Sequence, residues 1–339
     1  MRWIGVMAAV CAAGPALAEP LQVDQVGSLF VGGETISREG LPVREARFTA
    51  TGPVMKIDPN GDYVVGGMYA QYVKLADPRA KYPLMLWHGG GLSGSCWETT
   101  PDGRPGWQSF FLHAGWDVYV SDAYERGRSG FPRYPDMVPD EPVWRTMKEA
   151  WVIFRFGPPD GWDIDPAKRK PFPGSHFPPS SVEGLAREAV PRWISTDARI
   201  QHDYDLYVNA VGPSVIVVHS QGGAFAMQEA VTAPERVKAV VAVEPSGAPD
   251  PDKVDAARVK NIPHLFVYGD HTDQEPWPKF RAAADRWIDA IRRAGGTVDV
   301  IDLPKQGITG NTHMMFQDDN SDQIAGLIQT WLAAHGMMK

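Results

Sequence analysis

A serine at the end of a strongly apolar segment is the first residue that could do chemistry. Ser220 lies in the segment Ser214–Val231, SVIVVHSQGGAFAMQEAV, where β-branched residues lead into His-Ser-Gln and two glycines. A serine held on a sharp strand-to-helix turn can act as a nucleophile, and the usual spelling of such a turn is G-x-S-x-G. Residues 218–222 read V-H-S-Q-G, so only the second small position is kept. Serine is also a favoured N-cap, so the turn alone leaves an ordinary strand-to-helix connection open.

A run of glycines upstream could supply the hydrogen-bond donors that a nucleophilic serine requires. These donors are normally the amide after the serine and another from the loop after the third strand, and they stabilise the developing oxyanion. Residues 84–97 read LMLWHGGGLSGSCW, an apolar strand that ends in His88 and three glycines. A flexible turn is the alternative interpretation. The position of the run, directly after the third predicted strand, favours this loop as a partner of Ser220.

A general base should follow the nucleophile and its orienting acid along the chain. His313 lies in the glycine-rich segment 304–320, between the last predicted strand and the last predicted helix, where this kind of fold places its base. His271 follows a strand and is the alternative. His264 lies inside a strand and His335 near the end of the last helix, so we interpret both as structural.

Two positions could supply the orienting acid. Glu244 follows the strand VKAVVAV, whereas Asp270 and Asp273 follow the next strand, in LFVYGDHTDQEP. The later position is the commoner one in hydrolases with this order of residues. The residues alone therefore leave the choice of acid open.

The elements around these residues predict an α/β fold. Short apolar strands alternate with helical patterns, which indicates a mostly parallel sheet that is buried on both faces and flanked by helices. The predicted strands are Leu84–Trp87, Trp116–Ser121, Ser214–His219, Val237–Val243, His264–Tyr268 and Val298–Leu303. Upstream, residues 47–58 and 61–75 predict an antiparallel hairpin with its turn at Pro59-Asn60-Gly61.

Residues 131–193 interrupt this alternation and predict an inserted cap. The segment is rich in proline and in aromatic residues, whereas disordered segments are poor in aromatics. The aromatic residues are Trp144, Trp151, Phe154, Phe156, Trp162 and Trp193. Long insertions are often active-site lids, so we expect this one to line the entrance to the site, with Trp151 and Trp162 setting the substrate range. A packed excursion that only stabilises the sheet edge is the alternative. Residues 19–130 and 194–339 then form the core.

The N-terminus predicts export. Arg2, an apolar run and the small-residue site Ala16-Leu17-Ala18 are typical of a secretory signal peptide, residues 1–18, which is too short to span a membrane. The mature chain then keeps one cysteine, Cys96, which cannot form an internal disulfide. We expect a periplasmic or secreted protein.

Composition excludes some partners. The 339 residues carry a net charge of -8, so no basic surplus exists to neutralise nucleic-acid phosphates. No zinc, nucleotide or P-loop pattern is present, so we expect neither a metal nor a cofactor. Asp318 and Asp319 are interpreted as capping and dipole-matching residues at a helix start. Arg126 and Arg128 are expected to hold loops together, and Trp97 and Glu98 to line the pocket or to pack beneath it.

Several longer motifs resemble a small group of exported bacterial α/β-hydrolase esterases, the esterase 713 type from Alcaligenes. These motifs are HGGGLSGSCWETTPDGRPGWQSFFLHAGWDVYVSDAYERGRSG, EAWVIFRFGP, HSQGG, VVAVEPSG and GNTHMMFQDDNSDQIAGLI. The resemblance runs from Leu84 to the C-terminus and includes parts of the cap. It implies an α/β-hydrolase fold and a carboxylic ester hydrolase whose catalytic acid follows strand six of the sheet.

The resemblance also implies roles for particular residues. Ser220 would be the nucleophile, Glu244 the acid and His313 the base, and the amides of Gly90 and Gln221 would form the oxyanion hole. The group has adjacent cysteines where this chain has Gly90-Gly91, so we expect a more pliable loop. A lactonase or peptidase with the same triad, or a non-catalytic binding protein of the same fold, are the alternatives. The expected partner is a small ester substrate, and a homodimer is a possible assembly.

Overall fold

A computed structural model describes residues 20–131 and 138–339 of the chain. The predicted signal peptide, residues 1–18, lies outside the described residues. Within them, no helix combines the length and the apolar character needed to cross a bilayer.

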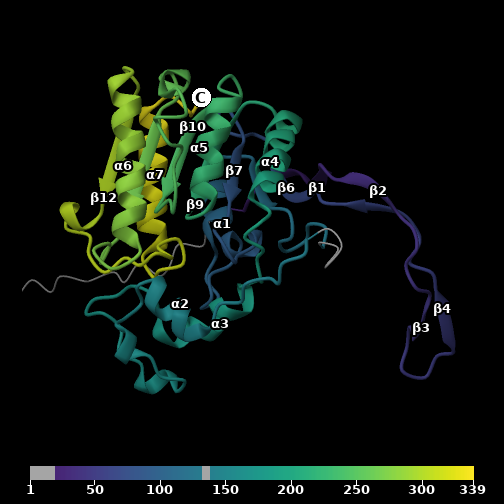
Figure 1. Cartoon of the computed structure of the whole chain (residues 1–339). Coiled ribbons are helices and arrows are strands. Elements are labelled where there is room, and N and C mark those ends of the chain that lie inside the picture. Colours follow the sequence, from purple (N-terminus) through teal and green to yellow (C-terminus); the bar gives the residue numbers. More distant parts are fainter. Residues whose placement is uncertain (1–19, 132–137) are drawn as a thin grey trace, which may run out of the picture.

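An eight-stranded sheet forms the centre of the molecule (Figure 1). Its spatial order is β1 (Val23–Val31), β6 (Met68–Leu75), β8 (Val118–Asp122), β7 (Leu84–Trp87), β9 (Ser214–His219), β10 (Val237–Val243), β11 (His264–Tyr268) and β12 (Val298–Asp302). The pairs β1–β6 and β6–β8 are antiparallel, and the remaining pairs are parallel. The prediction of a mostly parallel sheet is confirmed.

Helices cover both faces of this sheet and explain why its strands are apolar throughout. α1 (Trp107–His113) and α7 (Ser321–Ala334) pack on the face that contains Val215 and Val217. The helices of the other face, which contains Ile216 and Val218, are α4 (Asp197–Val211), α5 (Gly222–Thr232) and α6 (Trp277–Arg293). Each side chain of β9 is therefore buried, whichever face it points to.

Four predicted strands have the observed bounds, whereas β8 differs from its prediction at both ends and β12 at one end. β8 begins at Val118 because Trp116 still belongs to the turn after α1, where its amide donates to the Phe111 carbonyl. β12 ends at Asp302 because Leu303 opens a 3₁₀ turn over Pro304–Gln306.

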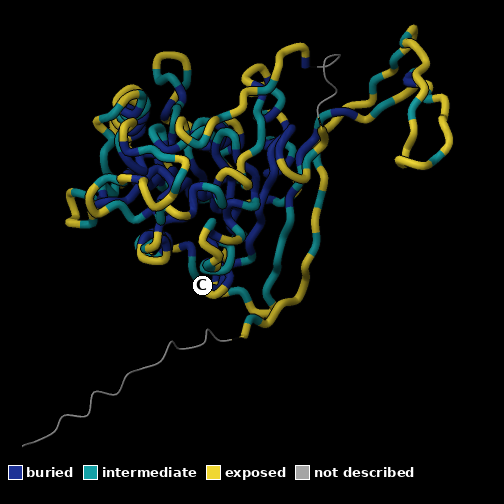
Figure 2. Tube along the Cα trace, turned by 90° about the horizontal axis from the view of Figure 1, so that it is seen from below, coloured by how far each residue is buried: buried dark blue, intermediate teal, exposed yellow. Residues whose placement is uncertain are grey.

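The predicted N-terminal hairpin is wrong. β4 (Val54–Ile57) pairs with β3 (Arg44–Arg47), and β5 (Gly61–Val65) pairs with β2 (Glu34–Arg38), so no turn at residues 59–61 joins two paired strands. The Asn60 side chain instead bonds both backbone groups of Leu41, at 2.8 and 2.9 Å. The two resulting two-stranded sheets project away from the central sheet as an arm, most of it exposed (Figures 1 and 2).

The described part of the insertion, residues 138–193, lies beyond one end of the sheet, below it in Figure 1. It contains α2 (Met147–Ile153), α3 (Val182–Glu188) and three 3₁₀ turns, Pro159–Gly161, Pro166–Lys168 and Pro179–Ser181. Thr146 caps α2, because its side-chain oxygen accepts a hydrogen bond from the Glu149 amide at 3.1 Å.

The aromatic residues of the insertion form two groups, one packed inside the insertion and one facing the site. Trp151 is fully buried, packs against Phe156 and Trp162, and donates its indole N–H to the Pro158 carbonyl at 3.0 Å. The expectation that Trp151 and Trp162 line the entrance is therefore wrong, since they pack inside the insertion itself. Other aromatic side chains face the site, as described below.

Candidate active site

Ser220 occupies a strained turn between β9 and α5. Its φ of +52° lies in the left-handed region, which is costly for a residue with a side chain. The turn requires glycine two residues later, because a Cβ on Gly222 would lie 2.5 Å from Val218 and 2.8 Å from the His88 carbonyl. The second small position of the motif is thus explained by the close approach of helix and strand.

Glu244 follows the neighbouring strand β10 and is brought beside this turn. The Ser220 amide donates to the Val243 carbonyl at 3.0 Å, and the Ser246 amide donates to the Ser220 carbonyl at 3.1 Å. Glu244 itself has a φ of +44°, and only 1% of the residue is exposed. When the eight strands of the central sheet are numbered in the order of the sequence, β10 is the sixth.

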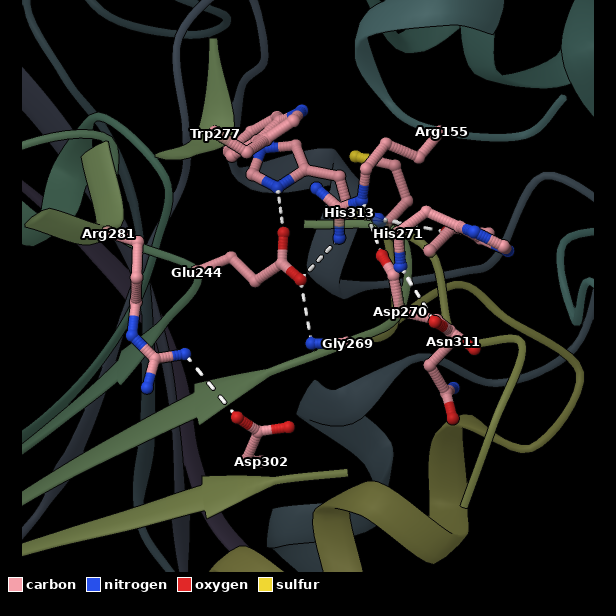
Figure 3. A network of polar contacts seen from close by, with 12 residues as sticks. Arg155, Glu244, Gly269, Asp270, His271, Trp277, Arg281, Asp302, Asn311 and His313 are labelled. Atoms are coloured by element: carbon pink, nitrogen blue, oxygen red, sulfur yellow. Dashed lines mark hydrogen bonds and ion pairs between the residues drawn. The ribbon is translucent and has the colours of Figure 1, made fainter. Parts of the chain in front are cut away.

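His313 lies against Glu244 (Figure 3). Its Nδ1 is 2.7 Å from Oε2 of Glu244, and both side chains are 1% exposed. Aromatic rings pack around the imidazole, with ring centroids 4.1 Å away for Trp277, 4.3 Å for His219 and 5.5 Å for Phe154. These contacts hold the ring in one orientation.

The surroundings of this pair favour a neutral histidine beside an ionised carboxylate. Burial lowers the pKa of His313 to about 4, and the nearby positive charges of Arg155 and Arg145 act in the same direction. Burial would raise the pKa of Glu244, but Arg155 and the hydrogen bond with His313 outweigh it and lower that pKa to about 2. At neutral pH, His313 Nδ1 therefore donates to Glu244, and Nε2 carries a lone pair.

Arg155 is the second partner of Glu244 and was missed by the sequence analysis. It lies in the insertion directly after α2, with a φ of +62° and 1% exposure. Its Nη2 donates to Glu244 Oε1 at 2.5 Å, and its Nε donates to the Asp270 carbonyl at 2.7 Å. The Gly269 amide also donates to Glu244 Oε1, at 2.7 Å (Figure 3). The only feature of the sequence that could have indicated Arg155 is its position among aromatic residues, in the segment WVIFRF.

Asp270 does not contact His313. Its two carboxylate oxygens accept hydrogen bonds from the amides of His271, at 2.8 Å, and Gly310, at 3.0 Å. Of the two acids left open by the residues, only Glu244 bonds the imidazole in the described structure. The alternative base, His271, stacks on Phe172 with a centroid distance of 4.2 Å.

The remaining histidines make structural contacts. His264 is buried and its Nδ1 bonds the Ile262 carbonyl, and His335 lies 3.4 Å from the Asp299 carboxylate. His219, next to the serine, donates from Nε2 to the His313 carbonyl at 3.0 Å. His219 thus helps to hold the loop that carries the proposed base.

The glycine-rich loop after β7 approaches the turn of Ser220. A Cβ on Gly89 would lie 2.7 Å from His219 Nδ1 and 2.9 Å from the Ser220 Cβ, so only glycine permits this approach. Within residues 20–131 and 138–339, the backbone amides of Gly90 and Gln221 donate no hydrogen bond. Both amides are therefore available to a ligand.

The Ser220 hydroxyl and the His313 ring make no direct hydrogen bond in the described structure. Nucleophile and base are often further apart in ligand-free enzymes and tighten when substrate binds. The side chains of Ser220, Glu244 and His313 lie beyond the carboxyl ends of the parallel strands, where loops carry functional groups in open α/β sheets.

Asp318 has a different role from the one predicted. It is fully buried, and its carboxylate accepts hydrogen bonds from the amide and hydroxyl of Thr312, at 2.8 and 2.7 Å, and from the Asn311 side chain at 3.0 Å. Asn320 occupies the N-cap position of α7 without a side-chain capping hydrogen bond, and Asp319 bonds His176. Asp318 therefore fixes the two residues that precede His313, which a local helix-start pattern could not indicate.

Two further predictions concern the loop after β8. Arg126 is buried and pairs with Glu125, while Arg128 pairs with Asp122 and Glu98. Both arginines contact neighbouring loops. Trp97 is fully buried against Trp107 and Phe316, so it packs beneath the site.

A cavity that opens to solvent lies between the glycine-rich loop and the insertion. Its described lining residues are Gly90, Gly91, Leu92, Val143, Trp144, Arg145, Thr146, Met147, Ala150, Phe154, Val182, Leu185, Ala186, Ala189, Val190 and Arg192. Among the described residues no group of three or more His, Cys, Asp or Glu side chains is arranged to hold a metal ion.

Known proteins resemble this chain. A family model described as the alpha/beta hydrolase fold matches residues 82–286, more than half of the chain. The solved structure of a bacterial esterase is 33% identical, with a TM-score of 0.80, and covers 95% of this chain and 99% of its own. A protein from a fungal species, named "Probable secreted lipase phiG", is 27% identical and covers 80% of this chain and 88% of its own.

Proposed function

The chain belongs to the alpha/beta hydrolase family, and we propose that it is a serine esterase, which cleaves carboxylic esters through an acyl-enzyme. The family match and the similarity to a bacterial esterase confirm the fold and the resemblance predicted from the sequence. The names of the two relatives, an esterase and a secreted lipase, support an ester as the substrate. The observation that carries the mechanism is the 2.7 Å contact between His313 and Glu244 beside the turn of Ser220.

The proposed reaction has two stages. His313 Nε2 accepts the proton of Ser220 while Oγ attacks the ester carbonyl carbon, and it returns the proton to the alcohol as the carbon–oxygen bond breaks. A water molecule, deprotonated by His313, then attacks the acyl-enzyme. The carboxylic acid leaves, and the Ser220 hydroxyl is restored.

The surrounding groups stabilise the charges of this reaction. The amides of Gly90 and Gln221 donate hydrogen bonds to the oxyanion of the tetrahedral intermediate. Glu244 holds the tautomer of His313 that leaves Nε2 free, and it stabilises the imidazolium that forms. Glu244 is suited to this because it stays ionised, with its pKa lowered to about 2 by Arg155 and His313 despite burial.

The proposal includes a cap and an exported enzyme. Residues 131–193 are assigned to the cap because its described part supplies most of the cavity wall above Gly90. The predicted signal peptide and the name of the secreted fungal relative support a periplasmic or secreted location.

Labelling with a fluorophosphonate probe tests the serine mechanism. The wild-type protein should react, whereas Ser220→Ala should neither react nor turn over a p-nitrophenyl ester, with a loss of roughly a million-fold in kcat. The variant keeps Gly222 and Gly223, so its melting temperature should be close to that of the wild type. Labelling or fast turnover in Ser220→Ala would show that another residue is the nucleophile.

A pair of amide variants tests the acid. Glu244→Gln removes the charge that orients His313 and should lower kcat by about ten-thousand-fold. Asp270→Asn serves as the matched control and should cost far less, because Asp270 bonds only loop amides. Both variants are checked by thermal unfolding. The reverse ranking in two folded proteins would assign the acid to the loop after β11.

A further inference from the structure

The cavity beside the glycine-rich loop is lined by two arginines, and within the described ranges only one of them is paired with a carboxylate. Its lining contains Arg145 and Arg192 and, among the described residues, no aspartate or glutamate. The rest of the wall is largely apolar and includes Trp144, Phe154 and Leu185. The whole chain has a net charge of -8, so the cavity and the protein as a whole are opposite in the sign of their charge.

Arg192 is the more informative of the two arginines. A backbone bridge with Val143 holds it in place, through hydrogen bonds of 2.7 and 3.2 Å. A Cβ on Gly90 would collide with its Nη1, so the guanidinium lies directly against the oxyanion loop. Its Nε is buried without a hydrogen-bond partner, and in the described part of the chain no carboxylate forms an ion pair with it.

Arg145 brings a second charge to the same cavity. Its guanidinium lies over the Phe154 ring, 5.6 Å from the centroid, and its Nη1 is 2.9 Å from the Glu149 carboxylate at the surface. Burial and the charge of Arg192 lower the pKa of Arg145, although Glu149 opposes them. Arg145 also contributes to the lowered pKa of His313. The two guanidinium groups therefore flank the reaction centre from the loop side and the histidine side.

From this arrangement we propose that the substrate is an ester that also carries a carboxylate, such as a monoester of a dicarboxylic acid. The inference rests on the proposed ester hydrolysis and specifies its substrate class. A guanidinium binds a carboxylate through two parallel hydrogen bonds, which Arg192 has free donors to make. The apolar wall accommodates the carbon chain between the carboxylate and the scissile ester.

Two other roles for Arg192 make different predictions. A guanidinium that stabilises the oxyanion would act on every ester, whether or not it carries a second charge. An arginine that only supports the backbone of Gly90 would also affect all esters equally. A carboxylate-binding arginine affects only the charged ones.

A matched pair of substrates separates these roles. Mono-4-nitrophenyl glutarate carries a carboxylate, and 4-nitrophenyl pentanoate has a similar length without one. We expect the wild-type enzyme to have the higher kcat/KM on the glutarate. Arg192→Met should lower kcat/KM on the glutarate by about 10- to 100-fold, the usual range for a hydrogen bond to a charged group, and leave the pentanoate nearly unchanged. Arg192→Lys should recover part of the loss.

Control variants complete the experiment. Arg145→Met should lower the preference for the glutarate by a smaller factor, because Glu149 already neutralises part of the Arg145 charge. Arg187→Met removes an exposed charge from α3 outside the cavity and should change neither rate. An equal loss on both esters in Arg192→Met, or a wild-type enzyme that favours the pentanoate, would overturn the inference while ester hydrolysis itself still stands. Absence of turnover on both esters would instead refute the proposed function.

Discussion

Arg155 should control the pH range in which the enzyme works. It donates to one oxygen of Glu244 while His313 bonds the other, at 2.5 and 2.7 Å. The pKa of His313 is lowered to about 4, mainly by burial, and Arg155 is one of the positive charges that contribute to this lowering. The base must be neutral to accept a proton, so kcat/KM of the wild type should fall only as pH approaches 4.

Replacing Arg155 by methionine removes that positive charge but keeps a long side chain beneath Trp277. For two charges about 6 Å apart, with an effective dielectric constant of about 20, Coulomb's law gives about 3 kcal/mol. This energy corresponds to roughly two pKa units. The pKa of His313 should therefore rise. In a plot of kcat/KM against pH, the fall on the acid side (the acid limb) should then occur at a pH that is higher by up to roughly two units.

Arg155 also lowers the pKa of Glu244, so this variant should raise that pKa as well. Glu244 keeps its hydrogen bond from the Gly269 amide, at 2.7 Å, and Arg145 keeps its charge near the imidazole. Burial lowers the pKa of His219 well below its usual value, so that ring stays neutral throughout. The predicted movement of the acid limb can thus be assigned to Arg155.

The assay is kcat/KM on a neutral ester between pH 4 and pH 8. Arg155→Lys keeps the charge and should keep the acid limb near its wild-type position, even if kcat falls. Removing one partner of a buried pair costs about 3–5 kcal/mol, so thermal unfolding must show that each variant is folded at the assay temperature. If the acid limb of a folded Arg155→Met enzyme stays in place while the plateau drops, Arg155 only supports the structure and the electrostatic reasoning is wrong.

Two further predictions concern residues whose role the sequence did not indicate. Asp318→Ala leaves the donors of Asn311 and Thr312 unpaired and should lower the free energy of unfolding by about 1–3 kcal/mol. Asp319→Ala changes an exposed neighbour and serves as the control, so it should lower the melting temperature far less than Asp318→Ala does. Trp151→Ala should cost about 3–5 kcal/mol of unfolding free energy without reordering rates across an ester series. Trp144→Ala removes an exposed ring of the cavity wall and should reorder those rates with little effect on unfolding. The opposite pattern for the two tryptophans would show that the cavity is not the substrate site.

The parts of the fold that the sequence predicted well are those dictated by local pattern. The strands at Ser214–His219 and Val237–Val243 have the observed bounds because a short segment rich in β-branched residues suits a strand buried on both faces. The N-terminal hairpin failed because neighbouring strands with similar patterns do not indicate which of them pair. There β5 pairs with β2, with the paired strands β3 and β4 between them in the chain, and Asn60 bonds Leu41 where a hairpin turn was expected.

For the site, the sequence could indicate types and order but not contacts. The residues alone left Glu244 and Asp270 as alternatives, and the choice of Glu244 came from the family resemblance, because a sequence does not give the position of either acid relative to His313. Arg155 could not be found, because 89 residues separate it from Glu244 and no spacing rule connects an insertion to a strand end. Asp318 was misassigned for a different reason, because its partners are close in the chain but lie in the loop before the helix and not in the first turn of the helix.

The insertion contributes to each part of the proposed site, which argues against a lid that opens as one body. The Phe154 carbonyl accepts a hydrogen bond from the His313 amide, at 3.0 Å. Arg155 bonds the acid, and the Val190 amide donates to the Gly91 carbonyl of the oxyanion loop, at 2.9 Å. Opening the whole insertion would leave the buried carboxylate of Glu244 without its cation and would release the loop that positions the base. We therefore expect substrate to enter past exposed side chains of the cavity wall, such as Trp144, while the backbone of the insertion stays in place beside the proposed site.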